Sequence, residues 1–215
     1  MGATGSRKPQ RCVAYLMSGW ISGAVDEVAE LSEQAARIYQ EMDPADLNVR
    51  FHLAATWHNL ALMVCDLKEF TRAGEFYHRA IDMWAECDAY WFVAFSTHGL
   101  GDISLDQGDL SLAGTHYRRA LAISTELGDR CQAHCLAGLA CVSALDGKHA
   151  RAGLLWAAVL TFESASGTRS NPSERQRYEH IIEAVANAPK FQRALDNEPH
   201  SLRSVVAEAL TGENY

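Results

Sequence analysis

The chain has 215 residues, of which 48% are hydrophobic and 21% charged, a composition typical of a globular domain or a short repeat array with its own core. Lys and Arg number 19 against 27 Asp and Glu, giving a net charge of -8, and no basic run exceeds the N-terminal segment SRKPQR, which argues against direct nucleic-acid binding. The longest apolar runs are too short to span a bilayer, so we expect a cytoplasmic protein without membrane association.

The N-terminal region divides into two predicted parts. Residues 1–10 are expected to be a flexible N-terminus, and residues 11–42 a first, degenerate helical hairpin. The segment VDEVAELSEQAARIY, residues 25–39, has the apolar spacing of an amphipathic helix. We expect this hairpin to close one end of a repeat array.

A pattern of small and aromatic residues then recurs three times, at intervals of about 40 residues. The aligned positions are Leu60, Leu100 and Leu139, then Ala73, Ala113 and Ala152, and then Tyr77, Tyr117 and Trp156. Small residues let two helices approach closely, and the aromatic ring fills the space between neighbouring hairpins, which is the logic of the tetratricopeptide repeat (TPR). The pattern predicts helical hairpins at about residues 44–85, 87–126 and 129–165.

The pattern ends near residue 165. The loop-like segment SGTRSNPSE follows, and then come shorter helical segments, so residues 166–215 are predicted to form C-terminal capping helices and a tail. The expected fold is therefore all-α: a TPR-like α-solenoid of about four helical hairpins over residues 11–165, closed by the capping helices. Stacking is required because no single hairpin can bury its apolar side alone.

The C-terminal part also carries a family resemblance. Matching residues are Ala137, Gly138, Leu139, Ala140, Gly147, Arg151, Ala152, Leu154, Leu155, Ala157, Ala158, Pro172, Arg175, Tyr178, Phe191, Ala194, Leu202, Val206, Ala209 and Leu210. On these positions the chain resembles the C-terminal TPR region of bacterial LuxR-type and SARP-type ATP-dependent transcriptional regulators. The resemblance implies a regulatory repeat domain that senses an inducer or holds a partner. The chain departs from those regulators in having no P-loop and no recognisable helix-turn-helix, and in Trp156 and Val159, which replace a small and an acidic residue.

The first helix of each TPR hairpin lines the concave side of a solenoid, so residues three and four apart along it predict a groove. That groove consists of Phe51, His58, Leu62, Trp91, Phe95, His98, Asp102, His134 and Cys141. The set is mainly apolar and aromatic, with three histidines and one charge. It suits a small apolar or aromatic molecule, or a protein segment, better than a highly charged peptide.

Several of these residues also have a purely structural interpretation. His58 and His98 share one repeat position, and partly buried histidines with satisfied hydrogen bonds are the more common explanation. Cys131, His134 and Cys135 have types that bind metals, but no fourth ligand is near in sequence, so buried thiols are favoured. We expect no metal and no cofactor.

The leading hypothesis is a TPR sensor or adaptor module of a bacterial regulatory system that binds its ligand or partner in the concave groove. One alternative is a pocketless protein–protein scaffold. Another, less favoured, is an unusual enzyme in which His98 and Asp102, one helical turn apart, act as an acid–base pair. A homodimer is left open.

Overall fold

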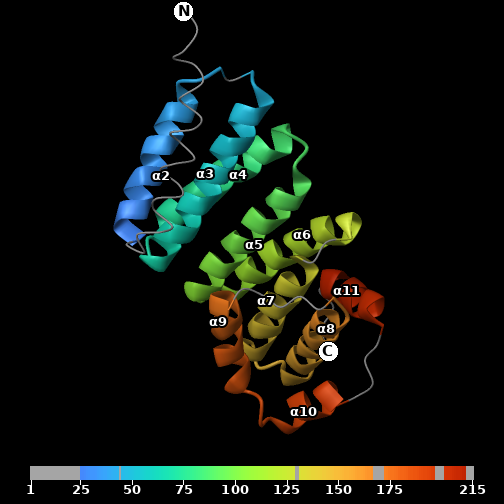
Figure 1. Ribbon diagram of the computed structural model, residues 1–215. Helices are drawn as coiled ribbons and strands as arrows, with labels where there is room; N and C mark the ends of the chain where they lie inside the picture. The colour runs from blue at the N-terminus through green and yellow to red at the C-terminus, as the bar shows by residue number, and fades with distance from the viewer. Residues whose placement is uncertain (1–24, 44, 129–130, 167–171, 197–200, 212–215) are drawn as a thin grey trace, which may run out of the picture. The chain divides into compact units, whose positions relative to one another are not determined.

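The computed structural model describes residues 25–43, 45–128, 131–166, 172–196 and 201–211, and every regular element in these ranges is an α-helix (Figure 1). The helices are α2 (Val25–Gln40), α3 (Leu47–Asp66), α4 (Phe70–Glu86), α5 (Tyr90–Asp106), α6 (Leu110–Leu127), α7 (Cys131–Leu145), α8 (His149–Ser166), α9 (Pro172–Glu183), α10 (Pro189–Asp196) and α11 (Leu202–Thr211). The all-α prediction is thus confirmed for the described ranges. The predicted flexible residues 1–10, and residues 11–24 of the first predicted hairpin, lie outside them. Within the described residues, none of the helices has the length and apolar character that crossing a membrane requires.

The described residues form two compact units, one up to residue 99 and the other from residue 100 onward, and helix α5 contributes its first part to one and its last part to the other. We call them unit 1 and unit 2 and describe each by itself.

Unit 1 is built around the pair of helices α3 and α4, which are joined by a short turn, with α2 packed against α3. The small residues Ala73 and Ala80, which lie seven residues apart on α4, are both fully buried. Tyr77 lies between them on α4, and its ring is so close to Gly99 that a Cβ there would lie 2.4 Å from it. The recurring small residues therefore lie where a helix backbone packs closely against an aromatic ring, as the repeat pattern predicts.

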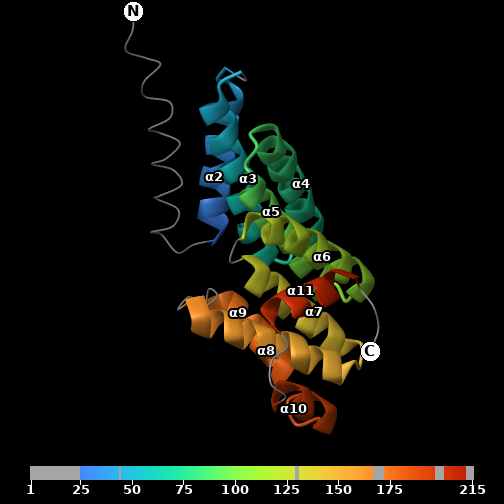
Figure 2. The same ribbon diagram turned by 90° about the vertical axis from the view of Figure 1, so that its right-hand side faces the viewer.

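Unit 2 repeats this arrangement in α6, α7 and α8. Tyr117 of α6 is fully buried, and a Cβ on Gly101 or Gly138 would come within 2.6 and 2.5 Å of its ring. Three further helices pack on this framework: α9 on α7, α10 on α8, and α11 on both α8 and α6 (Figures 1 and 2). Helix α10 packs closely on α8 at Gly153. A Cβ at this position would lie 2.5 Å from the carbonyl oxygen of Phe191, so the contact requires glycine.

The turns inside the hairpins share one backbone conformation. Lys68 (φ 63°), Gly108 (φ 79°) and Gly147 (φ 74°) all occupy the left-handed region directly after the first helix of a hairpin. Glycine adopts this conformation without steric cost, whereas a side chain such as that of Lys68 opposes it. The periodic turn therefore marks the same repeat as the buried small residues.

Candidate functional site

The predicted groove residues divide between the two units. Phe51, His58 and Leu62 on α3, and Trp91, Phe95 and His98 on α5, belong to unit 1, while Asp102, His134 and Cys141 belong to unit 2. Their parent helices α3, α5 and α7 are the first helices of successive hairpins. We call the side of these helices that carries the predicted residues the first-helix face, and describe it separately in each unit.

In unit 1 the first-helix face is aromatic. The ring of Phe51 meets that of Phe92 edge-on at 5.1 Å between centroids, and Phe92 stacks on Trp84 at 4.7 Å. Trp91 lies 4.8 Å from Phe95 and 4.5 Å from Phe92. Apart from Trp84, which is buried, these rings are half-buried. Sequence reasoning missed Phe92, although its position next to Trp91 in the segment YWFVAF was a signal.

The two histidines of unit 1 that were predicted to line the groove, His58 and His98, lie in structural surroundings. Nδ1 of His58 lies 2.9 Å from the hydroxyl oxygen of Ser96, and its ring contacts Tyr77 and Trp84 at 5.5 and 5.4 Å. His98 is 4% exposed. The contacts of His58 thus join α3 to α4 and α5, and the burial of His98 fits a core residue.

Leu62, unlike the buried His98, is exposed to solvent. It lies three helical turns beyond Phe51 on the same side of α3, and 42% of it is exposed. An apolar side chain is thus presented to solvent on the same side of α3 as Phe51, toward the other end of the helix. Its repeat-aligned counterparts are Asp102 on α5 and Cys141 on α7.

In unit 2 the first-helix face is organised by the carboxylate of Asp102. The hydroxyls of Tyr117 and Tyr178 each donate a hydrogen bond to its Oδ1 at 2.7 Å, and Nη1 of Arg177 lies 3.2 Å from its Oδ2. Both tyrosines are fully buried, while the Asp102 side chain is 13% exposed. Burial, together with the negative charge of Asp102, raises the pKa of Tyr117 well above its ordinary value, so this hydroxyl stays a donor. We call these four residues the Asp102 network.

The Asp102 network places helix α9 over the face. Besides Tyr178 and Arg177, α9 contributes Tyr178's carbonyl oxygen, which lies 3.7 Å from the thiol sulfur of Cys141. At its start, Arg175 bonds Glu163 of α8 at 2.6 Å and stacks over the ring of Trp156 at 4.9 Å. In unit 2, then, the predicted groove residues Asp102 and Cys141 contact a helix of the chain itself.

The remaining predicted residue, His134, is half-buried on α7 between two buried cysteines, Cys131 and Cys135, whose sulfur atoms are 3.8 Å apart. Among the described residues, no three His, Cys, Asp or Glu side chains gather as metal ligands. Burial raises the pKa of the Cys135 thiol well above its ordinary value, which keeps it protonated and unreactive.

Comparisons with known proteins address the fold. No family model matches the chain, and no curated protein matches it either. Among solved structures it is similar to aspartyl phosphate phosphatase F from Bacillus subtilis, with 14% identity and a TM-score of 0.67 over 88% of this chain and 48% of the phosphatase. The chain therefore spans about half of that protein.

Two further structures match along nearly their whole length. A kinesin light chain with nearly identical TPR-like repeats from Podosopora anserina has 19% identity and a TM-score of 0.60, over 95% of both chains. BtubC (BKLC) from P. vanneervenii has 17% identity and a TM-score of 0.58, over 99% of this chain and 92% of its own. The TPR-like fold predicted from the repeat is confirmed.

Proposed function

We propose that the chain is a TPR-like interaction module of a bacterial regulatory system, and that the first-helix face of unit 1 binds an apolar segment of a partner protein. The resemblance of residues 127–210 to the C-terminal repeats of LuxR-type and SARP-type regulators supports the regulatory setting. The fold supports an interaction role, because stacked helical hairpins offer an extended surface to a partner.

One observation carries the choice of a protein segment: the same face is covered by a helix in unit 2. There α9 lies on α7 and is anchored through Asp102. In unit 1 the aligned position is Leu62, which is exposed and apolar. This face binds a helix through polar contacts in unit 2. We therefore expect the corresponding face of unit 1, which is apolar, to bind a helix of a partner through apolar contacts.

The aromatic rings of the first-helix face of unit 1 supply the contact area that such binding needs. Phe51, Trp91 and Phe95 are half-buried, so a partner covering them removes further apolar surface from water. Large aromatic side chains of this kind carry most of the binding energy in protein interfaces. An amphipathic helix that places its apolar side on the face is the occupant that fits best.

The geometry gives less support to catalysis by His98 and Asp102. The Asp102 carboxylate accepts hydrogen bonds from two buried tyrosines and pairs with Arg177, so its oxygens are engaged in holding α9. A general base must instead reach the proton of a substrate.

The proposal is tested by photo-crosslinking. A benzophenone side chain at position 62 should capture a defined segment of one protein in a lysate of the source organism, and mass spectrometry identifies that segment. The same group at Leu112, which is similarly exposed at 45% but lies on α6, is the matched control. Capture of the same proteins from both positions, or of none from position 62, would contradict the proposal. An adduct with the mass of a small molecule would favour a ligand-sensing role instead.

A further inference from the structure

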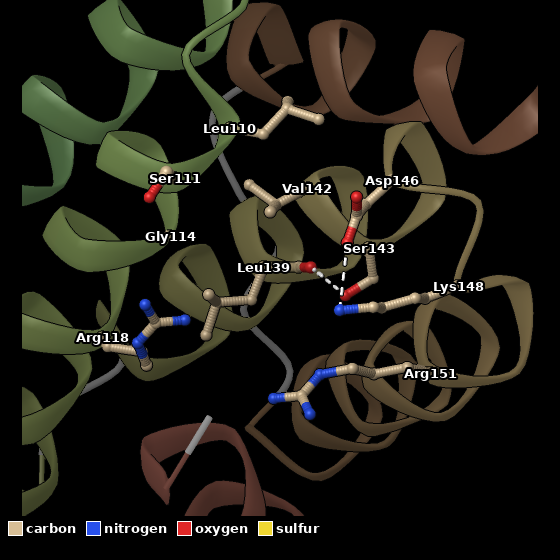
Figure 3. Close-up of a pocket in the computed structure, with 10 residues that line it drawn as sticks. All are labelled: Leu110, Ser111, Gly114, Arg118, Leu139, Val142, Ser143, Asp146, Lys148 and Arg151. Atoms are coloured by element: carbon tan, nitrogen blue, oxygen red, sulfur yellow. Dashed lines mark hydrogen bonds and ion pairs between the residues drawn. The ribbon is translucent and has the colours of Figure 1, made fainter. Parts of the chain in front are cut away.

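Unit 2 contains a cavity that lies away from the residues predicted from sequence. It has a volume of about 290 Å³ and is bounded by the start of α6, the end of α7 and the start of α8 (Figure 3). This volume is at the lower end of the range for ligand pockets in proteins. The cavity therefore fits a small ligand.

The cavity is positively charged in an otherwise acidic chain. Among the described residues that line it, Arg118, Lys148 and Arg151 stand against one carboxylate, that of Asp146, which gives these residues a formal charge of +2. Figure 3 shows the guanidinium groups of Arg118 and Arg151 pointing into the cavity from opposite sides. The ammonium group of Lys148 lies 3.0 Å from Asp146. Arg151 also borders a narrower cavity at α11 with Glu208, so Arg118 is the decisive residue.

Arg118 has no counter-ion in the described part of the chain. Within the ranges that the structure describes, its half-buried guanidinium has no hydrogen bond and no ion pair. Burial, and then repulsion by Arg151, lower its pKa. Two guanidinium groups that face one cavity repel each other unless an anion lies between them.

The backbone is shaped to seat that guanidinium. A Cβ on Gly114, one helical turn before Arg118, would lie 3.2 Å from its Nη1, so glycine leaves room for the group to lie along α6. Helices α6 and α8 both begin at the cavity, at Leu110 and His149. The carboxylate of Asp109 already caps α6 by accepting a hydrogen bond from the amide of Leu112, so it is the positive end of the α8 dipole that adds to the attraction for an anion.

We propose that this cavity binds a phosphate group, either inorganic phosphate or the phosphate of a small phosphorylated molecule. A phosphate carries up to two negative charges and offers several oxygens to donors converging from different sides, which matches two guanidinium groups and an ammonium group. A carboxylate leaves part of this donor set unused.

The test is titration of the full chain with inorganic phosphate, at constant ionic strength, followed by calorimetry. We expect saturable binding by the wild type and by Arg119→Gln, which removes the same charge from an exposed position on α6. Arg118→Gln should weaken binding at least tenfold, while its melting temperature without phosphate stays equal to or above that of the wild type, because a buried charge is removed.

A second titration with glycerol 3-phosphate separates the two sources of phosphate. Tighter binding than inorganic phosphate would assign the cavity to a phosphorylated small molecule, and equal or weaker binding would assign it to free phosphate. No saturable binding up to millimolar phosphate would overturn the proposal. Equal losses in Arg118→Gln and Arg119→Gln would also overturn it, since they would show general charge attraction.

Discussion

The two units carry residues of opposite character at the same repeat position. In unit 1 the position holds Leu62, which is exposed. In unit 2 it holds Asp102, which two tyrosine hydroxyls and one guanidinium engage. A carboxylate in that place has a large desolvation cost unless it is paired, and helix α9 brings the partners. In unit 2 the residue at this position thus binds the chain's own helix α9, whereas in unit 1 the residue at this position is exposed to solvent.

The largest effect is expected from removing the carboxylate of unit 2. Asp102→Ala leaves the Tyr117 and Tyr178 hydroxyls and the Arg177 guanidinium without their acceptor, and breaking a buried ionic pair costs about 3–5 kcal/mol. Urea unfolding followed by circular dichroism measures the change. The control is Leu62→Ala, where an exposed side chain is shortened and less than about 1 kcal/mol is expected. Equal losses for both would mean that the Asp102 network does not hold α9.

A second comparison concerns glycines inside helices. Gly138→Ala forces a methyl group into the Tyr117 ring, because its Cβ would lie 2.5 Å from that ring, and should destabilise unit 2 by ~1–3 kcal/mol. Gly74→Ala on α4 meets no atom within 4 Å and should raise stability by ~0.5–1 kcal/mol, since alanine favours a helix. Thermal unfolding of the two variants should shift in opposite directions. A shift in the same direction would show that the ring position is wrong.

Alkaline pH should lower the free energy of unfolding of unit 2, because two buried cysteines and a buried tyrosine have raised pKa values. Burial raises the pKa of Cys135 and Cys141 above the ordinary value of 9.0, and that of Tyr117 above 10.0. The unfolded chain releases these protons first, so the stability they contribute is fully present below about pH 9 and is lost as pH rises from there. Each group adds a slope of up to ~1.4 kcal/mol per pH unit.

Urea unfolding of the wild type and of Cys141→Ala between pH 8 and 10.5 measures this loss. The variant should lose less stability per pH unit than the wild type. A free energy of unfolding that stays constant up to pH 10.5 would contradict the burial of these groups.

The smallest effect is expected at the hairpin turns. Lys68 has a φ of 63°, where unit 2 has Gly108 with a φ of 79°. Lys68→Gly relieves the steric cost of a left-handed side chain but adds backbone freedom to the unfolded state, so a gain of about 0.5 kcal/mol is expected. Gly108→Lys should lower stability by ~1–2 kcal/mol. Differential scanning calorimetry resolves the two changes, and a loss for Lys68→Gly would contradict the shared turn geometry.

Much of the fold was predictable because it is periodic. Ala73, Ala113 and Ala152 align in the sequence, and all three are fully buried where helices meet. Close helix contact demands small residues at fixed intervals, so the sequence displays the contact directly. Tyr77 and Tyr117 were predictable as core residues for the same reason.

The position of α9 was not predictable in this way. Tyr178 and Asp102 are 76 residues apart, and the tail that carries Tyr178 does not repeat, so no periodic signal relates the two. Asp102 was therefore predicted to be a groove residue, and its contacts with Tyr178 and Arg177 of the tail could not be predicted. The cationic cavity could not be predicted either, because Arg118 and Arg151 come from different hairpins and are 33 residues apart in the sequence.

The most direct measurement is the affinity of the segment captured at position 62, made as a fluorescent peptide, for the wild type and for Trp91→Ala. For Trp91→Ala we predict an affinity at least about thirtyfold weaker in fluorescence anisotropy, since losing an interface aromatic costs ~2 kcal/mol or more. Leu112→Ala should bind like the wild type, and all three proteins should retain their helical circular dichroism. Unchanged affinity in Trp91→Ala would contradict the assignment of the first-helix face of unit 1 as the interaction surface.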